Sequence, residues 1–165
     1  MSDTLTMPQG PCYPDLRGKL ALVTGGGSGI GKGISRRLGA EGMHVFLCGR
    51  TEATLAEVAA EIRDAGGTAT PVVADVSVAE DVARLMEAVA AAGPLQVLVH
   101  NAALVRGGPL ARTDPDYWHR MFATNMDSTY YLSRAAMDVM VPRRSGSMVF
   151  ISTIGVMRAH RRMFA

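Results

Sequence analysis

Thr24-Gly25-Gly26-Gly27-Ser28-Gly29-Ile30-Gly31 is the stretch that decides how this chain folds. The apolar run Leu20-Ala21-Leu22-Val23 precedes it, and a helical segment over residues 34–38 follows it. Strand, glycine-rich turn and helix in this order form the context in which a glycine motif binds a nucleotide. Glycine lets the backbone turn tightly and approach a pyrophosphate, whose charge the first N–H groups of the helix attract. The stretch therefore predicts a phosphate-binding turn.

Two other interpretations of this turn need to be weighed. Residues 26–33 nearly match the P-loop pattern GxxxxGK[ST], but Gly33 stands where a Ser or Thr hydroxyl must hold magnesium. The second interpretation is a structural turn without a ligand, which a lone glycine motif does not exclude. The pattern downstream favours nucleotide binding over both.

Apolar runs and helical periodicities alternate along the remainder of the chain. They predict helices over residues 33–42, 51–65, 77–92 and 116–140, and strands over residues 43–48, 70–74, 95–99 and 147–151. Strands that alternate with helices of this length form βαβ units with parallel strands. The sequence therefore predicts an α/β fold.

The composition is that of one globular enzyme domain. The 165 residues are 48% hydrophobic and 19% charged, which is sufficient for one core. A net charge of +2 gives no support for binding to nucleic acid or to a membrane surface. No apolar run reaches the length of a membrane span. We therefore expect no nucleic-acid partner and no membrane partner.

Residues 1–16 are set apart from this domain. They contain Pro8, Pro11 and Pro14 and lack the basic and apolar segments of a signal peptide. We expect a flexible arm over residues 1–16 and one domain over residues 17–165, in a cytoplasmic protein. The cysteines, Cys12 and Cys48, lack metal-ligand spacing. No metal site is expected, and Cys48 is predicted to be a small core residue.

The end of the second predicted strand bears on the choice of cofactor. About twenty residues after a glycine turn of this kind, an NAD-binding fold places an acidic residue on the ribose 2′-hydroxyl. Here the sequence reads Cys48-Gly49-Arg50. A carboxylate would repel a 2′-phosphate, whereas Gly49 carries no charge and Arg50 can pair with the phosphate. The missing acid favours NADP over NAD.

Several motifs, in this order along the chain, resemble those of the short-chain dehydrogenase/reductase family. Gly25-xxx-Gly29-x-Gly31 resembles the family's TGxxxGxG turn, Asn101-Ala102 stands within its Asn-Asn-Ala-Gly motif, and Asn125 matches its helical asparagine. The resemblance covers residues 17–165. It implies an NAD(P)-binding Rossmann domain, truncated on its C-terminal side, with a doubly wound parallel sheet of about five strands in the order 3-2-1-4-5.

The resemblance also implies a set of cofactor-binding residues. Asp75, after the third strand, would reach the adenine amino group, although Asp75 and Ser77 also suit helix capping. His100 and Ala103 depart from the family pattern, and we interpret His100 as a hydrogen-bonded structural substitute. The predicted set is Gly25, Ser28, Gly29, Ile30, Gly31, Arg50, Asp75, Val76, Asn101, Ala102 and Ala103.

Three residues are expected at the reacting centre. The resemblance implies that Asn125 accompanies a bend in its helix and a water that relays protons. It also implies a hydroxyl, after the fifth strand, that hydrogen-bonds the substrate carbonyl. Alignment from the strand selects Thr153 and alignment from Gly155 selects Ser152, so both are retained and Ser152 is favoured. Tyr130-xxx-Arg134 superficially resembles the family's catalytic Tyr-xxx-Lys pair, but it precedes the fifth strand and is interpreted as a decoy.

That catalytic pair has no counterpart in the sequence, whose only lysines are Lys19 and Lys32. We expect an NAD(P)-dependent oxidoreductase that transfers a hydride between NADP(H) and a small carbonyl or alcohol substrate. We expect it to be inactive as this chain alone and a homo-oligomer when complete. The alternative is a non-catalytic dinucleotide-binding or assembly protein that ends at residue 165. In either case, residues 148–151 of the last strand are predicted to form an exposed apolar edge.

Overall fold

The computed structural model of the protein describes residues 13–105 and 113–153. Its helices and strands alternate as the sequence predicts. In chain order they are the 3₁₀ turn η1 (Pro14–Leu16), β1 (Leu20–Thr24), α1 (Gly29–Ala40), β2 (His44–Gly49), α2 (Glu52–Asp64), β3 (Thr68–Val73), α3 (Ala79–Ala92), β4 (Leu95–His100), α4 (Pro115–Phe122), the π-helical segment η3 (Ala123–Asp127), α5 (Ser128–Arg143) and β5 (Ser147–Phe150).

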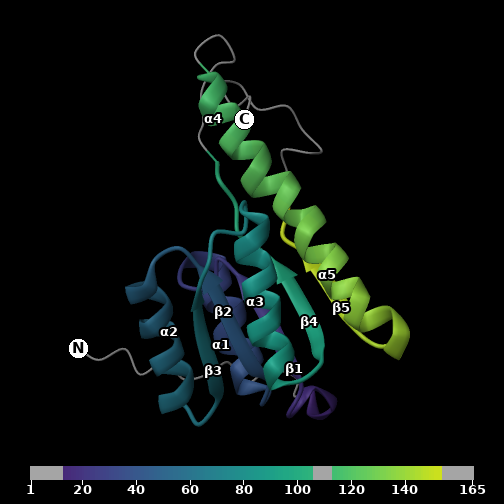
Figure 1. Cartoon of the computed structure of the whole chain (residues 1–165). Helices are drawn as coiled ribbons and strands as arrows, with labels where there is room; N and C mark the ends of the chain where they lie inside the picture. Colours follow the sequence, from purple (N-terminus) through teal and green to yellow (C-terminus); the bar gives the residue numbers. More distant parts are fainter. Residues whose placement is uncertain (1–12, 106–112, 154–165) are drawn as a thin grey trace, which may run out of the picture.

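The strands of the described ranges form one parallel sheet in the order β3-β2-β1-β4-β5 (Figure 1). β1 is central, and its Val23 lies opposite Leu47 of β2 and Val99 of β4. All of β1 is buried, as expected of a parallel strand that helices cover on both faces. The strand order confirms the predicted Rossmann-like, doubly wound sheet.

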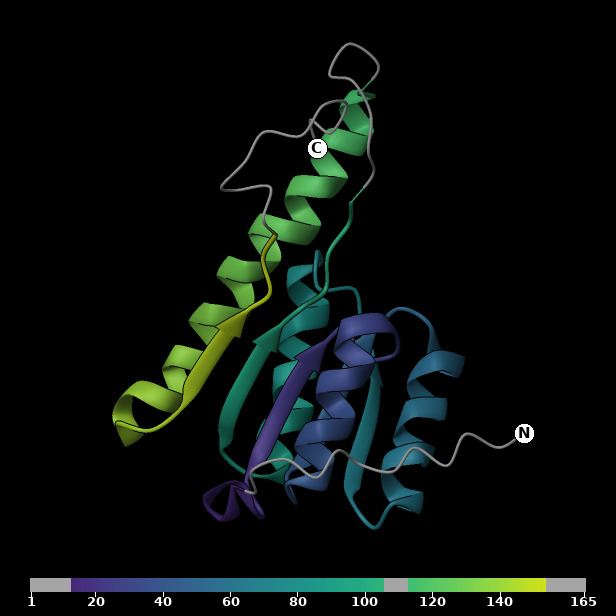
Figure 2. The ribbon, with the colours of Figure 1, turned by 180° about the vertical axis from the view of Figure 1, so that it is seen from behind.

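Helices cover both faces of the sheet. α1 and α2 pack on one face (Figure 2). Leu47 and Val58 are fully buried there. α3 and α5 pack on the other face, around Leu22, Leu85 and Leu132. Burial of a side chain of this size contributes about 1.5–3 kcal/mol to the free energy of unfolding. These two clusters hold the carboxyl ends of the strands in a fixed relation to one another.

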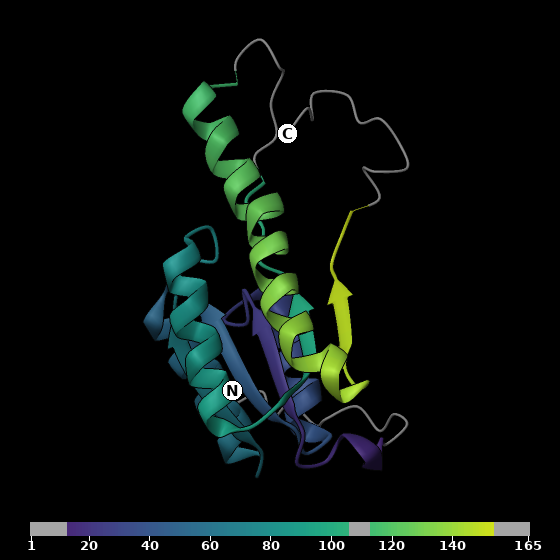
Figure 3. The ribbon, with the colours of Figure 1, turned by 45° about the vertical axis from the view of Figure 1, so that its right-hand side comes forward.

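The helix predicted over residues 116–140 is divided by a π-helical segment. α4 begins after Asp114, whose side chain accepts a hydrogen bond from the Asp116 N–H, and η3 then connects α4 to α5. Figure 3 shows α4 and α5 as a nearly continuous rod that extends beyond the sheet. Asn125 lies at the centre of η3, so the irregularity expected at this residue takes the form of a π turn. Such turns are frequent at functional sites.

Two helix starts differ from the sequence-based prediction. α1 begins at Gly29 and not at residue 33, because close packing of its first turn outweighs the poor helix propensity of glycine. α3 begins at Ala79 and not at residue 77, because Ser77 is held in the preceding turn. Its hydroxyl donates to Asp75 Oδ1 at 2.7 Å. β3 is likewise displaced, since it covers Thr68–Val73 where residues 70–74 were predicted.

The last residues of the predicted arm contact the domain. The backbone N–H of Tyr13 donates to Glu41 Oε2 at 2.7 Å, and Leu16 packs against the core on the α1–α2 face. Residues 1–12, and with them Cys12, lie outside the described residues.

The expected apolar edge is present along β5, with one exception. Within the described part of the chain, β5 pairs only with β4. The side chains of Val149, Phe150 and Ile151 are 44%, 47% and 36% exposed. Met148 was expected at the same exposed edge, but it is half-buried and packs against the α3–α5 core. The exposed part of the edge therefore begins at Val149.

Cys48 is a core residue, as predicted, and provides a probe of the fold. Its side chain is fully buried, and burial, assisted by the charges of Asp75 and Asp81, raises the pKa of its thiol to about 12. Because the thiolate is the reactive form, iodoacetamide at pH 8 should leave Cys48 unmodified until the chain unfolds. In a Cys12→Ser variant, Cys48 is the one remaining cysteine, so all modification is due to Cys48. Modification without denaturant at the rate of an unfolded peptide would contradict the packing of β2.

Candidate functional site

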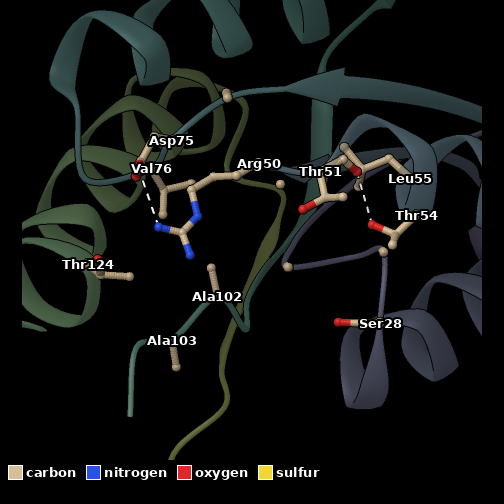
Figure 4. Close-up of a pocket in the computed structure, with 14 residues that line it drawn as sticks. Ser28, Arg50, Thr51, Thr54, Leu55, Asp75, Val76, Ala102, Ala103 and Thr124 are labelled. Carbon is tan, nitrogen blue, oxygen red and sulfur yellow. Dashed lines mark hydrogen bonds and ion pairs between the residues drawn. The ribbon is translucent and has the colours of Figure 1, made fainter. Parts of the chain in front are cut away.

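A cleft lies at the carboxyl ends of the strands, where the segments that follow β1, β2, β3 and β4 meet (Figure 4). This edge is where doubly wound α/β sheets bind ligands. The described residues that line it are Gly25, Gly27, Ser28, Gly49, Arg50, Thr51, Thr54, Leu55, Ala74, Asp75, Val76, Ala102, Ala103 and Thr124. The structure thus brings together seven residues of the predicted cofactor set: Gly25, Ser28, Arg50, Asp75, Val76, Ala102 and Ala103.

The glycine turn depends on the absence of side chains at two of its positions. Gly25 has φ +64°, a conformation that residues with a Cβ rarely adopt. A Cβ on Gly31 would lie 2.1 Å from the carbonyl oxygen of Gly25 and 2.6 Å from Asn101 Nδ2. α1 can therefore begin directly at the cleft, where its N-cap residue Ser28 makes no side-chain capping bond. The predicted residues Gly29 and Ile30 are exposed on the first turn of α1, beside the cleft wall.

Thr24 and Asn101 connect the glycine turn to the end of β4. Thr24 Oγ1 accepts hydrogen bonds from the backbone N–H groups of Asn101 and Ala102, both at 3.0 Å. The side-chain amide of Asn101 donates to the carbonyl oxygens of Thr24 at 3.0 Å and Gly25 at 3.4 Å. Asn101 thus supports the turn from behind and does not line the cleft. Thr24 was quoted as part of the motif but was not selected as a site residue.

Arg50 extends across the cleft towards Asp75 and Val76 (Figure 4). Its side chain is 68% exposed, and its Nη1 lies 3.9 Å from Asp75 Oδ2. An ion pair this exposed contributes at most about 1 kcal/mol, so Arg50 can reorient towards a ligand at little cost. A Cβ on Gly49 would make only ordinary contacts with Leu55, starting at 3.4 Å. The missing acid at residue 49 is therefore not required by packing.

Asp75 shapes the turn before α3, whose N-cap residue Val78 has no side-chain capping bond, so the predicted helix capping by Asp75 or Ser77 takes the form of a turn. Oδ1 of Asp75 accepts from the backbone N–H of Ser77 at 3.0 Å and from the Ser77 hydroxyl at 2.7 Å. Its own backbone N–H donates to Asp81 Oδ2 at 2.9 Å. Oδ2 of Asp75 faces Arg50 and leaves an acceptor at the cleft wall. Turn formation and ligand recognition are thus compatible at this residue.

Two threonines at the start of α2 were missed from the sequence. Thr54 Oγ1 donates to the carbonyl oxygen of Thr51 at 2.9 Å, and a Cβ on Gly27 would lie 2.7 Å from Thr54 Oγ1. The glycine turn therefore packs against the N-terminus of α2. The only sequence signal for this contact is the pair of hydroxyl residues directly after Arg50, and the same pattern also indicates ordinary helix capping.

Asn125 supports the cleft from η3. Its Oδ1 accepts from the Leu104 N–H at 2.8 Å, and its Nδ2 donates to the Leu104 carbonyl oxygen at 2.9 Å. These bonds hold the segment after Ala103 against the helix. Asn125 is not among the residues of the cleft wall, but the neighbouring Thr124 is. Thr124 was also missed as a site residue.

Ser152 and Thr153 lie at the same edge of the sheet as the cleft. The N–H of Ile151 donates to the carbonyl oxygen of His100 at 2.9 Å, so pairing with β4 continues one residue beyond β5. The two hydroxyl residues follow directly and are exposed. The structure does not include them in the described cleft wall, and Gly155, used to align them, lies outside the described residues.

Lys32 has the environment of a surface lysine. Its Nζ lies 2.8 Å from Glu61 Oε1 and 3.2 Å from Glu57 Oε1, both on α2. The hydrogen bond that Lys32 donates to Glu61 is the main cause of the raised pKa of Lys32. The ammonium is thus directed to α2, and Lys32 is not part of the described cleft wall. This geometry argues against the P-loop interpretation.

Tyr130 lies apart from the cleft. Its hydroxyl accepts from Arg134 Nη1 at 3.0 Å on the exposed face of α5. Its neighbours in a shallow groove there include Met126 and Met137. Tyr130 and Arg134 do not belong to the described cleft wall, in line with the decoy interpretation.

His100 is expected to make folding sensitive to mild acid. It is buried at the end of β4, and burial lowers its pKa below the ordinary value of 6.5. The unfolded chain therefore takes up a proton near pH 6.5 that the folded chain binds only at lower pH. Stability is then full above about pH 6.5 and falls as the pH drops towards the folded pKa. Burial also lowers the pKa of His44, so this residue likewise reduces stability as the pH falls.

Unfolding midpoints measured between pH 8 and pH 5 check this expectation. The range stays above the ordinary pKa of carboxyl groups, so histidines dominate the change. His100→Gln should make the unfolding midpoint fall less steeply between pH 6.5 and pH 5. The part of the fall that is due to His44 should remain. An unchanged pH dependence of the midpoint in this variant would contradict the contribution assigned to His100.

No group of His, Cys, Asp and Glu side chains among the described residues is arranged to hold a metal ion. None of the described helices combines the length and the apolar character needed to cross a bilayer.

Comparison with known proteins gives the family of this chain. The pattern of the family described as short chain dehydrogenase matches residues 19–163. The chain is 36% identical over 140 residues to a putative ketoacyl reductase of Streptomyces coelicolor, covering 83% of this chain and 54% of that protein. It is 35% identical over 150 residues to a galactitol 2-dehydrogenase (L-tagatose-forming) of Cereibacter sphaeroides, covering 91% of this chain and 58% of that protein. The chain therefore belongs to the short-chain dehydrogenase family of oxidoreductases.

Solved structures agree with this assignment. A variant of actinorhodin polyketide ketoreductase with NADPH superposes with a TM-score of 0.85 at 33% identity, covering 93% of this chain and 59% of that chain. A metagenomic short-chain oxidoreductase in complex with NADP gives a TM-score of 0.86 at 35% identity, covering 90% of this chain and 68% of that chain. The chain spans about half the length of the curated relatives that it matches.

Proposed function

We propose that this chain forms the NADP(H)-binding part of an oxidoreductase that transfers a hydride between NADP(H) and a small carbonyl or alcohol substrate. The observation that carries the proposal is Arg50 at the cleft, next to a residue 49 without a carboxylate. The relatives solved with NADPH or NADP support the choice of cofactor.

The residues of the cleft suit a dinucleotide phosphate. Gly25 and Gly31 leave the turn without side chains, so a pyrophosphate can approach the backbone and the start of α1. Ser28 adds a hydroxyl that makes no capping bond. Asp75 Oδ2 can accept from the adenine amino group, and Arg50 can pair with the 2′-phosphate. These residues would hold the two ends of the adenosine part of the cofactor.

The nicotinamide, when bound, supplies or takes up the hydride. In this proposal, the hydroxyl of Ser152 or Thr153 donates a hydrogen bond to the substrate carbonyl and orients it. Asn125 holds the segment after Ala103 in place, through its bonds to Leu104. The exposed apolar side chains of Met137 and Val141 on α5 support a homo-oligomer of the complete protein.

Exchange of the two residues after Cys48 should invert the cofactor preference. A charged contact to the 2′-phosphate is worth about 1.5–3 kcal/mol, so Arg50→Ala should weaken NADPH binding at least about tenfold. NADH binding should change much less. Gly49→Asp combined with Arg50→Ala should favour NADH, and a Cβ at residue 49 would make only ordinary contacts with Leu55. Fluorescence titration with both cofactors measures the effect.

Arg134→Ala is the matched control for this experiment. It removes the same charge from an exposed arginine on α5, outside the described cleft wall. NADPH affinity should stay unchanged in this variant. Equal losses of NADPH affinity in Arg50→Ala and Arg134→Ala would show a general charge effect and would refute a 2′-phosphate contact at Arg50.

A further inference from the structure

His100 joins the central sheet to the first turn of α5. It is the last residue of β4 and is only 5% exposed. Its Nε2 lies 2.9 Å from Ser128 Oγ and 3.2 Å from Thr129 Oγ1. His100 is not among the residues of the described cleft wall, and these two hydroxyls connect its side chain to the helix that borders the cleft.

The direction of these hydrogen bonds follows from the number of available hydrogens. The hydroxyl of Ser128 donates to the carbonyl oxygen of Thr124, and the hydroxyl of Thr129 donates to that of Asn125 at 2.8 Å. Each hydroxyl carries one hydrogen, so while both hydrogens are directed at these carbonyl groups, both hydroxyl oxygens are available to accept from the histidine. In this arrangement Nε2 of His100 is the protonated nitrogen of the neutral ring and shares its hydrogen between the two oxygens.

The two carbonyl groups held in this way both belong to η3. Its residues have two direct roles at the site. Thr124 lines the cleft, and the side chain of Asn125 holds both the N–H and the carbonyl group of Leu104. The chain of contacts thus runs from His100 through two hydroxyls to η3, and from η3 to the segment after Ala103.

We propose that His100 is a positioning residue that fixes η3, and through Asn125 the segment at Leu104, by donating from Nε2 to Ser128 and Thr129. The proposal rests on the proposed function only in taking the cleft as the cofactor site. Its structural part, the coupling of His100 to Leu104, is independent of any ligand.

Two substitutions separate the hydrogen bond from the volume of the ring. His100→Gln places an amide N–H close to the position of Nε2, whereas His100→Phe keeps the ring and removes the donor. The readout is the hydrogen exchange of the Leu104 amide, whose partner is Asn125 Oδ1, relative to that of core amides in β1. His100→Phe should accelerate the relative exchange of Leu104 about tenfold, and His100→Gln should keep it within about twofold of the original chain.

Val58→Ala is the control for a general loss of stability. Val58 lies on α2, is buried on the opposite face of the sheet, and has no part in this network. It should lower global stability without raising the relative exchange of Leu104. The proposal is overturned if His100→Phe leaves Leu104 protected, if His100→Gln fails to restore protection, or if Val58→Ala has the same effect as His100→Phe.

Thr129→Val serves as the second variant, should His100→Phe not fold. It removes one acceptor at nearly constant volume and should accelerate Leu104 exchange by a smaller factor. Full protection of Leu104 in this variant would count against the proposal.

NADPH titration of the same variants tests the effect on the cleft, and His100→Phe should bind NADPH a few times more weakly than His100→Gln. Absence of NADPH binding in the unsubstituted chain would refute the proposed function and leave the exchange result to decide the role of His100.

Discussion

Gly31→Ala is expected to abolish cofactor binding and to destabilise the fold by about 3 kcal/mol or more. The added Cβ would lie 2.1 Å from the carbonyl oxygen of Gly25 and 2.6 Å from Asn101 Nδ2. Neither group can move freely, because Asn101 is bonded to Thr24 and Gly25 lies in the turn itself. Overpacking in a rigid site costs about 1–3 kcal/mol, and a clash with backbone lies at or beyond the upper end of that range. A domain stability of about 5–15 kcal/mol makes this a large loss.

Gly33→Ala provides the matched control two residues further along the chain. Gly33 lies in the same helix, and a Cβ there would meet no atom within 4 Å. Alanine is the better helix former by about 1 kcal/mol, so this variant should be as stable as the original chain or more stable. Urea unfolding and NADPH titration of both variants check the expectation. Similar behaviour of the two variants would contradict the described packing of the glycine turn.

The second large effect concerns catalysis by the 165 residues themselves. The sequence has no tyrosine followed four residues later by lysine, and its tyrosines are Tyr13, Tyr117, Tyr130 and Tyr131. A bound carbonyl would therefore have the hydroxyl of Ser152 or Thr153 but no tuned proton donor. General acid catalysis typically contributes about 10²–10⁴-fold, so NADPH oxidation with carbonyl substrates should be below detection. A fusion that adds the Tyr-xxx-Lys half of a relative should restore it.

Turnover by the unextended chain at ordinary family rates would show that another group acts as the acid. Tyr130 would then be the first candidate, since Arg134 donates a hydrogen bond to its hydroxyl. Tyr130→Phe would test it. Loss of that turnover in the variant would overturn the interpretation of the Tyr130–Arg134 pair as a decoy.

The fold could be predicted because its signals are local. β1 and β2 are continuous apolar runs between glycine turns, and this pattern has few interpretations other than buried parallel strands. The start of α1 was placed too late for the same reason. Local propensity counts Gly29 and Gly31 against a helix, while the contacts that require Gly31 to be small are with the Gly25 carbonyl and with Asn101, which is distant in the sequence.

Part of the lining of the candidate cleft could be predicted from motifs, whereas its supporting contacts could not. Residues within recognisable motifs, such as Gly25 and Asp75, line the cleft as expected. Thr54 and Thr124 were missed because their proximity to the cleft arises from tertiary packing and leaves little trace in the local sequence. His100 was interpreted as a hydrogen-bonded structural substitute, and the structure supplies its partners on α5.

The measurement that tests the central claim most directly is an equilibrium titration of the purified chain with NADPH and with NADH in the same buffer. The pairing of Arg50 with a 2′-phosphate predicts a Kd for NADPH at least about tenfold below that for NADH. Raising the salt concentration should reduce this difference, because the Arg50 side chain is exposed. Equal affinities, tighter binding of NADH, or no binding of either cofactor would contradict the assignment of this cleft as an NADP(H) site.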